Sequence, residues 1–314
     1  MTAYVTRKIL GLAITLLLVS LVVFIVLRLL PGDPAQLILG INASPGSLAR
    51  LREELGLNKP IHVQYFNWLR GLLTGNMGHS IFYEKSVSSL IISRLGVTIP
   101  LTLLATVLSV FIALPLGILA AINHQRLGDF GIIALSQLGI SVPAFWLGIL
   151  GLLLFSVKLN LLPAGGFIEW GTNPAGALRS LVLPVVTLAL IQSAALTRMT
   201  RSSALEVLSR DYVTAARSRG LPEIKILSKH VLSNSLISVI TLIGLQMGQL
   251  LAGAVIVETV FQLPGLGRLL ILAVEQRDLQ LVQGIVTLLA GAIITINYLV
   301  DIAYGILDPR IRLT

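Results

Sequence analysis

The sequence of 314 residues contains no cysteine, which excludes disulfides, thiolate catalysis and thiolate metal sites. It is also poor in charge: 12% of its residues are Asp, Glu, Lys or Arg, against about 25% in a typical globular domain. By contrast, 55% of the residues are hydrophobic and the mean hydropathy is +0.91. A soluble fold of this length could not bury so many apolar side chains, and a disordered chain would contain fewer of them. Lipid is therefore the solvent for most of this chain.

The sequence also lacks the common motifs of catalysis. It contains no Gly-x-x-x-x-Gly-Lys-Ser/Thr, no His-Glu-x-x-His and no Gly-x-Ser-x-Gly, so neither a P-loop ATPase nor a zinc or serine hydrolase is indicated. Its four histidines are scattered along the chain, at positions 62, 79, 124 and 230. No acidic residue or histidine lies in the middle of an apolar stretch, as a proton-coupled carrier usually requires. We expect no catalytic residue, no cofactor and no metal site.

Six apolar stretches are long enough to cross the roughly 30 Å hydrocarbon layer: residues 9–29, 98–122, 131–157, 180–199, 232–257 and 281–304. Because a lipid-exposed segment satisfies its backbone internally as a helix, an all-α polytopic membrane protein is predicted. The first stretch resembles a signal peptide, but its apolar run exceeds the usual 7–15 residues. It also ends at Arg28 instead of a small-residue cleavage site. We interpret it as a retained helix and divide the chain into 1–30, 31–96 and 97–314.

The basic residues predict the orientation. Eight lie in the second and fourth connections and four near the two ends, twelve in all, whereas the short connections on the other side hold four. The positive-inside rule therefore places both termini in the cytoplasm. The net charge of +9 is an orientation signal before it is a sign of nucleic-acid binding, and no nucleic-acid partner is expected.

Segment 31–96 has the pattern of two short amphipathic helices outside the membrane. Ser47 can cap the first, in which Leu48, Leu51 and Leu55 form a stripe that ends at Gly56. Pro60 suits the start of the second, where Ile61, Tyr65, Trp68 and Leu72 recur at helical spacing as far as Gly75. The segment either caps the helix ends or contacts an external delivery protein.

The loop 258–280 combines a Pro264-Gly265 turn with a short apolar run and is predicted to form a hairpin at the outer mouth of the bundle. Its candidates for an external gate are Glu258, Pro264, Gly265, Arg268 and Asp278. A second interpretation makes Glu258, Arg277 and Asp301 ordinary interfacial residues.

Inside the apolar stretches, Gln192, Gln246 and Gln249 are candidates for lining a pore, although intramembrane amides more often join helices. Gly244, Gly248 and Ala252 recur at four-residue spacing, which predicts a tight helix–helix contact. Pro115 and Pro143 permit kinks in the second and third stretches.

The cytoplasmic loop 200–231 is the most informative connection. Residues 201–217 have helical composition, Gly220 interrupts the pattern, and Leu221-Pro222 begins a second short helix through Ile226-Leu227. This arrangement predicts a rigid projection that docks into a cleft of another protein. The alternative is an ordinary basic loop that obeys the positive-inside rule.

Several motifs along nearly the whole chain resemble the permease subunit of a bacterial ABC importer of the dipeptide, oligopeptide and nickel class. They include Leu27-Arg-Leu-Leu-Pro-Gly-Asp-Pro34, Ser141-Val-Pro-Ala-Phe-Trp146 and Leu162-Pro-Ala-Gly-Gly166. The most specific are Asp211-Tyr-Val-Thr-Ala-Ala-Arg-Ser-Arg-Gly220, Val257-Glu-Thr-Val-Phe-Gln-Leu-Pro-Gly-Leu-Gly-Arg268 and Asp308-Pro-Arg-Ile-Arg312. All of them occur in order within a chain of six apolar stretches.

The resemblance implies a type I importer permease in the bacterial cytoplasmic (inner) membrane, with both termini inside. In this family a Glu-Ala-Ala-x-x-x-Gly loop couples the permease to its ATPase. The matching residues here are Thr214, Ala215, Ala216 and Gly220, followed by Leu221, Pro222 and Glu223. Threonine stands where glutamate is frequent, so an ion pair with the ATPase from this position is not available.

The implied partners are a second, homologous permease subunit in a heterodimer, two ATP-binding subunits, an extracytoplasmic solute-binding protein and membrane lipid. Peptides are the expected substrate, with nickel or a metal chelate, glutathione or a sugar as alternatives. A self-sufficient channel or ion-coupled carrier is the competing class of function, and in such a protein the Ala-Ala-x-x-x-Gly loop would serve no purpose.

Overall fold

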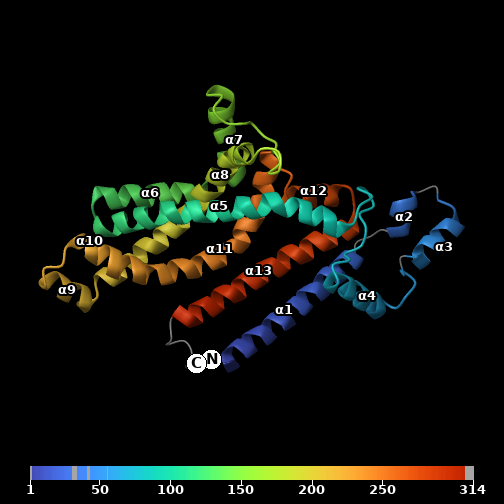
Figure 1. Ribbon diagram of the computed structural model, residues 1–314, viewed down its shortest axis with the longest axis horizontal. Helices are drawn as coiled ribbons and strands as arrows, with labels where there is room; N and C mark the ends of the chain where they lie inside the picture. Colours follow the sequence, from blue (N-terminus) through green and yellow to red (C-terminus); the bar gives the residue numbers. More distant parts are fainter. Residues whose placement is uncertain (1, 30–33, 41–42, 55, 308–314) are drawn as a thin grey trace. The chain divides into compact units, whose positions relative to one another are not determined.

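The computed structural model describes residues 2–29, 34–40, 43–54 and 56–307. Helices account for most of these residues, and they form no strand beyond one isolated bridge between His79 and Ser86. The helices are shown in chain order in Figure 1. The motif residues 30–33 and 308–312 and the stripe residue Leu55 lie outside the described part of the chain. The all-α prediction is confirmed.

Five predicted spans are single long helices in the structure. They are α1 (Thr2–Leu29), α5 (Val87–Ile122), α8 (Pro174–Leu208), α11 (Ser233–Val260) and α13 (Leu279–Leu307). Each contains an apolar stretch long enough to cross a membrane. α5 and α8 extend well beyond their predicted bounds, because polar residues at a helix end lower the hydropathy without ending the helix.

The third predicted span, 131–157, is broken. α6 (Leu127–Ser141) is followed by α7 (Ala144–Gly151) and a π-helical turn (Leu152–Lys158), and the two halves meet at an angle of 101°. Val142 and Pro143 adopt extended backbone at the break, where proline disfavours helical geometry in the residue before it. The described residues therefore hold five spanning helices, or six if this bent pair counts as one.

Two compact units make up the chain: residues 1–96 with 268–295, and residues 97–267 with 296–314. Gly96 ends the first of these ranges, which is also where the predicted segment 31–96 ends. The placement of that segment outside the membrane remains a prediction.

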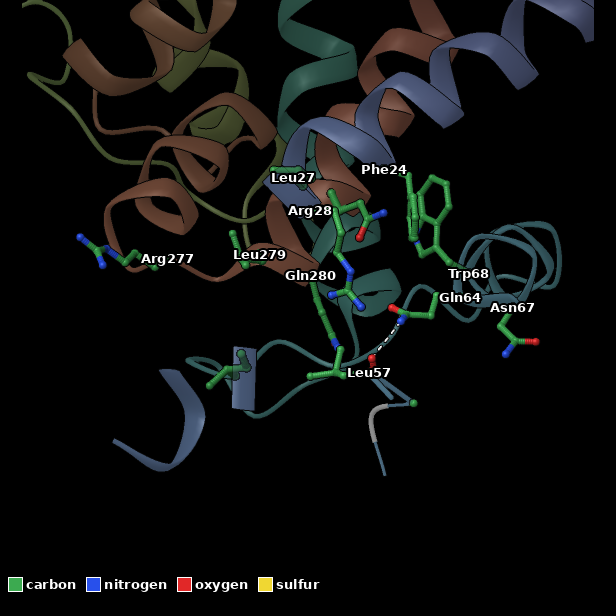
Figure 2. A pocket seen from close by; sticks show the side chains of 13 residues that line it. Phe24, Leu27, Arg28, Leu57, Gln64, Asn67, Trp68, Arg277, Leu279 and Gln280 are labelled. Carbon is green, nitrogen blue, oxygen red and sulfur yellow. Dashed lines mark hydrogen bonds between the residues drawn. The ribbon is translucent and has the colours of Figure 1, made fainter. Parts of the chain in front are cut away.

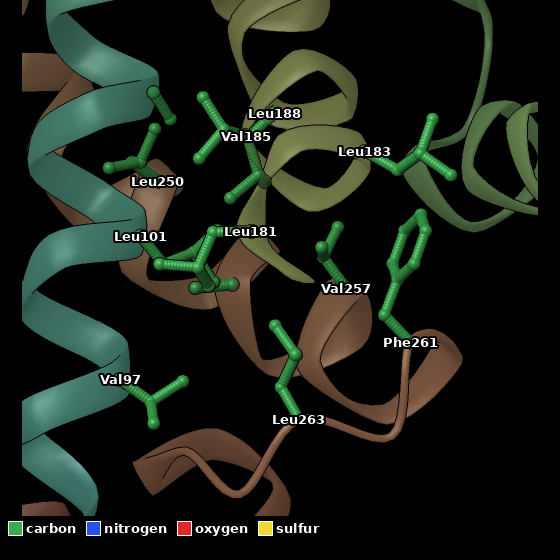
Figure 3. Packing of buried hydrophobic residues seen from close by; sticks show 12 residues of the cluster. Val97, Leu101, Leu181, Leu183, Val185, Leu188, Leu250, Val257, Phe261 and Leu263 are labelled. Carbon is green, nitrogen blue, oxygen red and sulfur yellow. The ribbon is translucent and has the colours of Figure 1, made fainter. Parts of the chain in front are cut away.

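The core of the larger unit is built around α8. Its side chains Leu181, Val185 and Leu188 pack with Val97 and Leu101 of α5 and with residues of α11 (Figure 3). In α8, 72% of the residues of the spanning stretch are buried within the chain, against 28% or less in the other long helices. In a single chain this leaves much apolar surface for lipid or for another subunit.

The smaller unit contains α2 (Pro34–Leu39), α3 (Pro45–Glu54) and α4 (Ile61–Leu73). The predicted cap of α3 was wrong by one turn: the Ser47 backbone N–H donates to Ser44 Oγ at 3.2 Å, so Ser44 caps the helix and Pro45 begins it. The helix predicted to begin after Pro60 is confirmed as α4, although Ile61 of its predicted stripe is exposed. Tyr65 and Trp68 pack on Phe24 of α1, with ring centroids 5.4 and 5.8 Å apart.

The tight contact predicted for the fifth span exists at one position of the small-residue stripe. A Cβ on Gly244 would lie 2.5 Å from the methyl groups of Val300 in α13. Ala252 is exposed instead. Gly244 therefore allows α11 and α13 to approach closely.

Candidate functional site

The projection predicted after the fourth span is present, but its helical part is divided. The expected single helix 201–217 is in fact the end of α8, a break at Ser209-Arg210, and α9 (Asp211–Ser218). A turn leads to α10 (Glu223–Ile226), and a π-helical turn (Leu227–Leu232) continues into α11. We call residues 209–226 the α9–α10 segment. It lies directly between the ends of α8 and α11, at one end of these helices in Figure 1.

The inner face of the α9–α10 segment is packed on the chain's own helices. Val213, Ala216 and Ile226 are buried in a cluster with Ala121 of α5 and Ala204 of α8. Ala216 was predicted as part of a docking face, and in this chain it is one of the residues that hold α9 in place.

The outer face of the segment is open. Thr214, Ala215, Pro222 and Glu223 are exposed, and Leu221 is half-buried. Ile224 is 76% exposed, although it is a large apolar side chain. Sequence reasoning missed Ile224; the signal was its place between Glu223 and Lys225 in a four-residue helix, where no apolar stripe accounts for it.

Two features set the angle of the turn between α9 and α10. Gly220 has a φ of +73°, and no atom lies within 4 Å of a Cβ built on it. The glycine is therefore required by backbone geometry and not by a lack of space. Arg217 Nε donates to Glu223 Oε1 at 2.7 Å across the turn, and this hydrogen bond lowers the pKa of Glu223 and raises that of Arg217.

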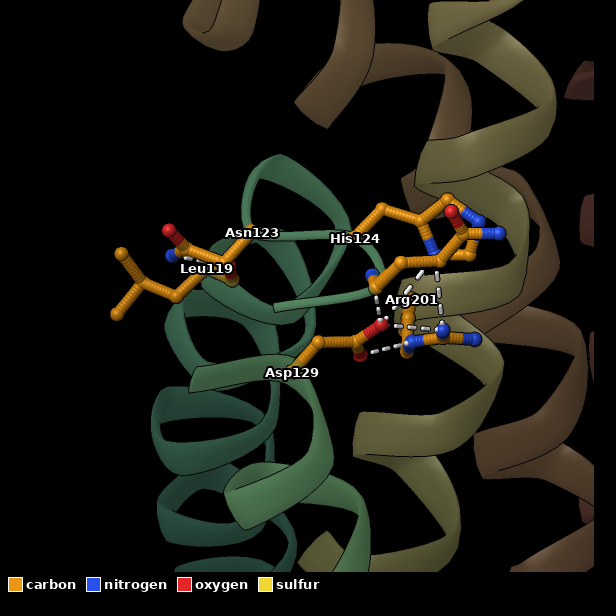
Figure 4. Close-up of polar contacts among 6 residues, drawn as sticks. Leu119, Asn123, His124, Asp129 and Arg201 are labelled. Carbon is orange, nitrogen blue, oxygen red and sulfur yellow. Dashed lines mark hydrogen bonds and ion pairs between the residues drawn. The ribbon is translucent and has the colours of Figure 1, made fainter. Parts of the chain in front are cut away.

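A buried ion pair lies where the α5–α6 connection meets α8 (Figure 4). Asp129, in the first turn of α6, is 2% exposed, and both of its carboxylate oxygens accept from Arg201 of α8: Oδ1 from Nε at 2.5 Å and Oδ2 from Nη2 at 2.7 Å. The Gln125 backbone N–H also donates to Oδ2, and His124 Nδ1 lies 3.2 Å from it. Sequence reasoning missed Asp129; the signal was an acidic residue in the first turn of an apolar helix.

Glu258, one of the gate candidates, is fully buried. Its Oε1 accepts from Thr98 Oγ1 at 2.6 Å, and its Oε2 accepts from the Gly267 backbone N–H at 2.7 Å in the first turn of α12 (Leu266–Glu275). Gly265 lies against this carboxylate, because a Cβ there would come within 2.3 Å of its three atoms. Glu258 thus fixes the Pro264-Gly265 turn between α11 and α12.

Asp278, a second gate candidate, is also buried. Its Oδ1 accepts from the Leu281 backbone N–H at 3.1 Å, which caps α13, and its Oδ2 accepts from Ser80 Oγ. Asp278 therefore ties the loop before α5 to the start of α13. Arg268 and Pro264 are half-buried, and the gate role of these residues stays a prediction.

The pore candidates differ in burial. Gln249 is exposed, whereas Gln192 and Gln246 are buried. One core cluster contains Leu188 and Leu250 and another contains Leu196 and Val239, so the stretches of α8 and α11 that carry Gln192 and Gln246 contribute to the same two clusters. Neither amide oxygen has a hydrogen-bond partner among the described residues.

The smaller unit contains a cavity of about 260 Å³ between α1, α4 and the start of α13. Phe24 and Trp68 form its aromatic wall, and Arg28 and Gln280 point toward the same space (Figure 2). Gln64 Nε2 is held by the Leu57 carbonyl at 3.0 Å. Among its lining residues are two arginines and four amides but no carboxylate, so the cavity has a basic and amide-rich surface.

The chain matches two family models. The model described as "Binding-protein-dependent transport system inner membrane component" matches residues 113–313, and the model of the N-terminal part of such membrane components matches residues 1–102. Together the two matches span almost the entire sequence.

Curated relatives match over the full length. A putative peptide transport system permease protein of Brucella abortus (strain 2308) is 44% identical over 312 residues, covering 99% of each chain. The glutathione transport system permease protein GsiC of Salmonella typhi is 41% identical with the same coverage. A probable peptide ABC transporter permease protein of Sinorhizobium fredii (strain NBRC 101917 / NGR234) is 38% identical over 99% of this chain and all of that one.

Solved structures show the same fold at low identity. A chain of the MetNI methionine ABC transporter, in an inward-facing conformation, has a TM-score of 0.59 and 16% identity, covering 70% of this chain and 96% of that one. A chain of an amino acid ABC transporter crystallised with histidines has a TM-score of 0.51 and 18% identity, covering 69% and 94%. Both likenesses concern the fold alone.

Proposed function

The chain belongs to the family of binding-protein-dependent transport system inner membrane components, and from this premise we propose that it forms half of a pore that imports peptides. It is a permease of an ABC importer and a multi-pass protein of the bacterial inner membrane. The observation that carries the proposal is the α9–α10 segment, which is open on its outer face and packed on α5 and α8 at its inner face. A projection held in this way can transmit a force that another protein exerts on it.

The ATP-binding subunits supply that force in our proposal. Two such subunits approach each other on binding ATP, and each carries a docked permease segment with it. Thr214, Ala215 and Ile224 form the contact surface toward the ATPase, with Gly220 and the Arg217–Glu223 pair setting its shape. Ala216 does not form part of this surface, because it is buried in the chain's own core, where it helps to hold α9 in place.

The pore then alternates between an inward and an outward opening. The chain runs from α8 through the α9–α10 segment into α11. A displacement of the segment therefore acts on α8 and α11, which both contribute to the core of the larger unit. Such a device transports only if its two states differ by no more than a few kcal/mol in free energy. Gln192 of α8 and Gln246 of α11 are the buried amides that we propose to line the pore.

The exposed surface and the predicted orientation indicate where the remaining subunits would contact this chain. A second, homologous permease covers apolar surface that α5 and α11 leave exposed, with lipid around the rest. An extracytoplasmic binding protein delivers substrate to segment 31–96 and to loop 258–280, where Pro264 and Arg268 contribute to the outer gate. The buried Glu258, Gly265 and Asp278 hold the shape of that loop. ATP hydrolysis takes place in the partner subunits.

Peptides are the proposed cargo, because relatives that match over the full length bear that name. Glutathione, carried in the name of a relative 41% identical, is itself a small peptide and belongs to the same class. The test is uptake of labelled di- and oligopeptides and of glutathione into proteoliposomes that contain both permeases and the ATPases, with binding protein outside and ATP inside. We expect uptake that requires both ATP and the binding protein. Uptake in the absence of ATP would contradict the proposal and favour a carrier or channel.

A further inference from the structure

The Asp129–Arg201 pair joins two helices that the chain does not connect directly. Asp129 lies at the start of α6, and Arg201 lies in the last two turns of α8, which ends at Leu208 and leads into the α9–α10 segment. Both carboxylate oxygens of Asp129 accept from the guanidinium of Arg201. This bidentate geometry fixes the orientation of the two side chains as well as the distance between them. The N-terminal end of α6 is thereby attached to the C-terminal end of α8, from which the α9–α10 segment begins.

The surroundings of this pair make the attachment stiff. The Gln125 backbone N–H donates to Asp129 Oδ2 at 3.0 Å, and Gln125 itself has a φ of +63°, so the tight α5–α6 turn is organised around the same carboxylate. Arg201 Nη2 also lies 3.1 Å from His124 Nδ1 in that turn. The single guanidinium of α8 therefore contacts both the α5–α6 turn and α6.

Fold stability alone gives a poor account of the pair. Taking two charges out of water costs about as much as their attraction returns, so buried ion pairs contribute little net stability, although loss of one partner is strongly destabilising. A second ion pair near the same end of α8 joins Glu206 to Arg210, the residue just before α9, and is exposed. Unlike this neighbouring pair, the Asp129–Arg201 pair joins α8 to a helix that is distant in the chain.

We propose that Asp129 and Arg201 are positioning residues of the transport cycle: their ion pair makes α6 move together with α8 when the ATPase displaces the α9–α10 segment. This inference rests on the proposed coupling of the segment to an ATPase. Without the pair, the segment would still dock and ATP would still be hydrolysed. α6 would then be joined to α8 only by packing, as at Gly139 and Ala194, and by the exposed Arg198–Gln137 hydrogen bond, and would follow less completely. More ATP would then be hydrolysed for each peptide imported.

The test separates this role from a structural one by removing both charges together. The single variants Asp129→Asn and Arg201→Met each leave one charge of the pair without its partner, the partly buried guanidinium or the buried carboxylate, and are expected to be less stable. The double variant Asp129→Asn/Arg201→Met leaves no such charge, and the amide oxygen of the introduced asparagine can still accept from the Gln125 N–H. The matched control is Glu206→Gln, which removes the exposed ion pair with Arg210 without changing a residue of the α9–α10 segment.

The readouts, in the complete reconstituted transporter, are thermal stability, ATP hydrolysis and peptide uptake. We expect the double variant to regain thermal stability relative to the singles, yet to hydrolyse roughly tenfold more ATP per imported peptide than wild type, a change of the size typical for coupling between sites. The control should keep the wild-type ratio. A double variant that recovers both stability and the wild-type ratio would overturn the inference. If wild type itself shows no ATP-dependent uptake, the proposed function fails instead.

Discussion

At the scale of single residues, burial decides what the polar side chains of this chain do. Glu258 and Asp278 were candidates for an outer gate, and both are fully buried acceptors that hold a turn or a helix start. The sequence could place them next to Pro264-Gly265 and at the start of a helix. It could not indicate their burial, because Thr98 and Ser80, their hydroxyl donors, are far away in the chain.

Gly265 provides a test of the packing around Glu258. We expect Gly265→Ala to destabilise the protein by about 1–3 kcal/mol, because the added methyl group would overlap a buried carboxylate that cannot move without losing its hydrogen bonds. Gly131→Ala is the matched control, since no atom lies within 4 Å of a Cβ built on this helical glycine. Thermal unfolding of the purified complex measures both. Equal melting temperatures for the two variants would contradict the described contact.

Gly220 provides a test of backbone geometry in the α9–α10 segment. A β-branched residue at a φ of +73° is strained by about 1–2 kcal/mol, whereas asparagine adopts this conformation more readily. Both side chains have room, because the position is open. We therefore expect Gly220→Val to reduce ATP-dependent peptide uptake by roughly tenfold, and Gly220→Asn to retain most of it. If the two variants transport alike, the turn geometry does not matter for coupling.

The Arg217–Glu223 pair predicts a pH dependence of the same turn. The Arg217 hydrogen bond lowers the pKa of Glu223 below its ordinary value, with burial opposing this shift. The stability that the ion pair contributes is therefore fully present above the ordinary glutamate pKa, about 4.3. It is lost as the pH falls through the lowered pKa of Glu223. Carboxyl carbon NMR of the labelled complex should show the pKa of Glu223 rise to its ordinary value in Arg217→Gln. An identical titration curve in the two proteins would be inconsistent with the ion pair.

At the scale of helices, apolar periodicity predicted which segments span the membrane and where most of them lie. Its failures have two physical causes. The break of the third span at Val142-Pro143 amounts to a bend of 101°, and a proline in a sequence shows that a bend is permitted but not its angle. The division of the predicted helix 201–217 arises at Ser209-Arg210, where a continuous helix would carry α9 away from its contacts with Ala121 and Ala204.

The packing of α11 on α13 gives a prediction at this scale. A helical Gly→Ala change normally stabilises by about 0.5–1 kcal/mol, but at Gly244 the new methyl group would meet Val300 at 2.5 Å. We expect Gly244→Ala to lower the melting temperature and the double change Gly244→Ala/Val300→Ala to restore part of it. At Gly253, where the nearest atom is 3.4 Å away, the same change should be tolerated. A Gly244→Ala variant as stable as wild type would show that the helices do not approach closely here.

At the scale of the whole molecule, the chain is a permease of an ABC importer, and we propose that partner subunits supply its energy. Its sequence contains no P-loop and no cysteine. We propose that the energy for transport enters through the α9–α10 segment, whose outer face was predicted in part from the resemblance of residues 211–220 to known permeases. The inner face and the Asp129–Arg201 pair required the structure, since they depend on which helices meet there.

Site-specific crosslinking tests the central claim, docking of the α9–α10 segment on the ATPase, most directly. Because the chain has no cysteine of its own, Ala215→Cys and Ile224→Cys introduce unique thiols on the outer face, and Phe130→Cys, exposed on α6, serves as control. In the assembled transporter we predict that short thiol crosslinkers join positions 215 and 224, but not 130, to cysteines in the ATP-binding subunits, with a yield that changes on ATP binding. Absence of crosslinks from both segment positions in an intact, hydrolytically active complex would contradict the account.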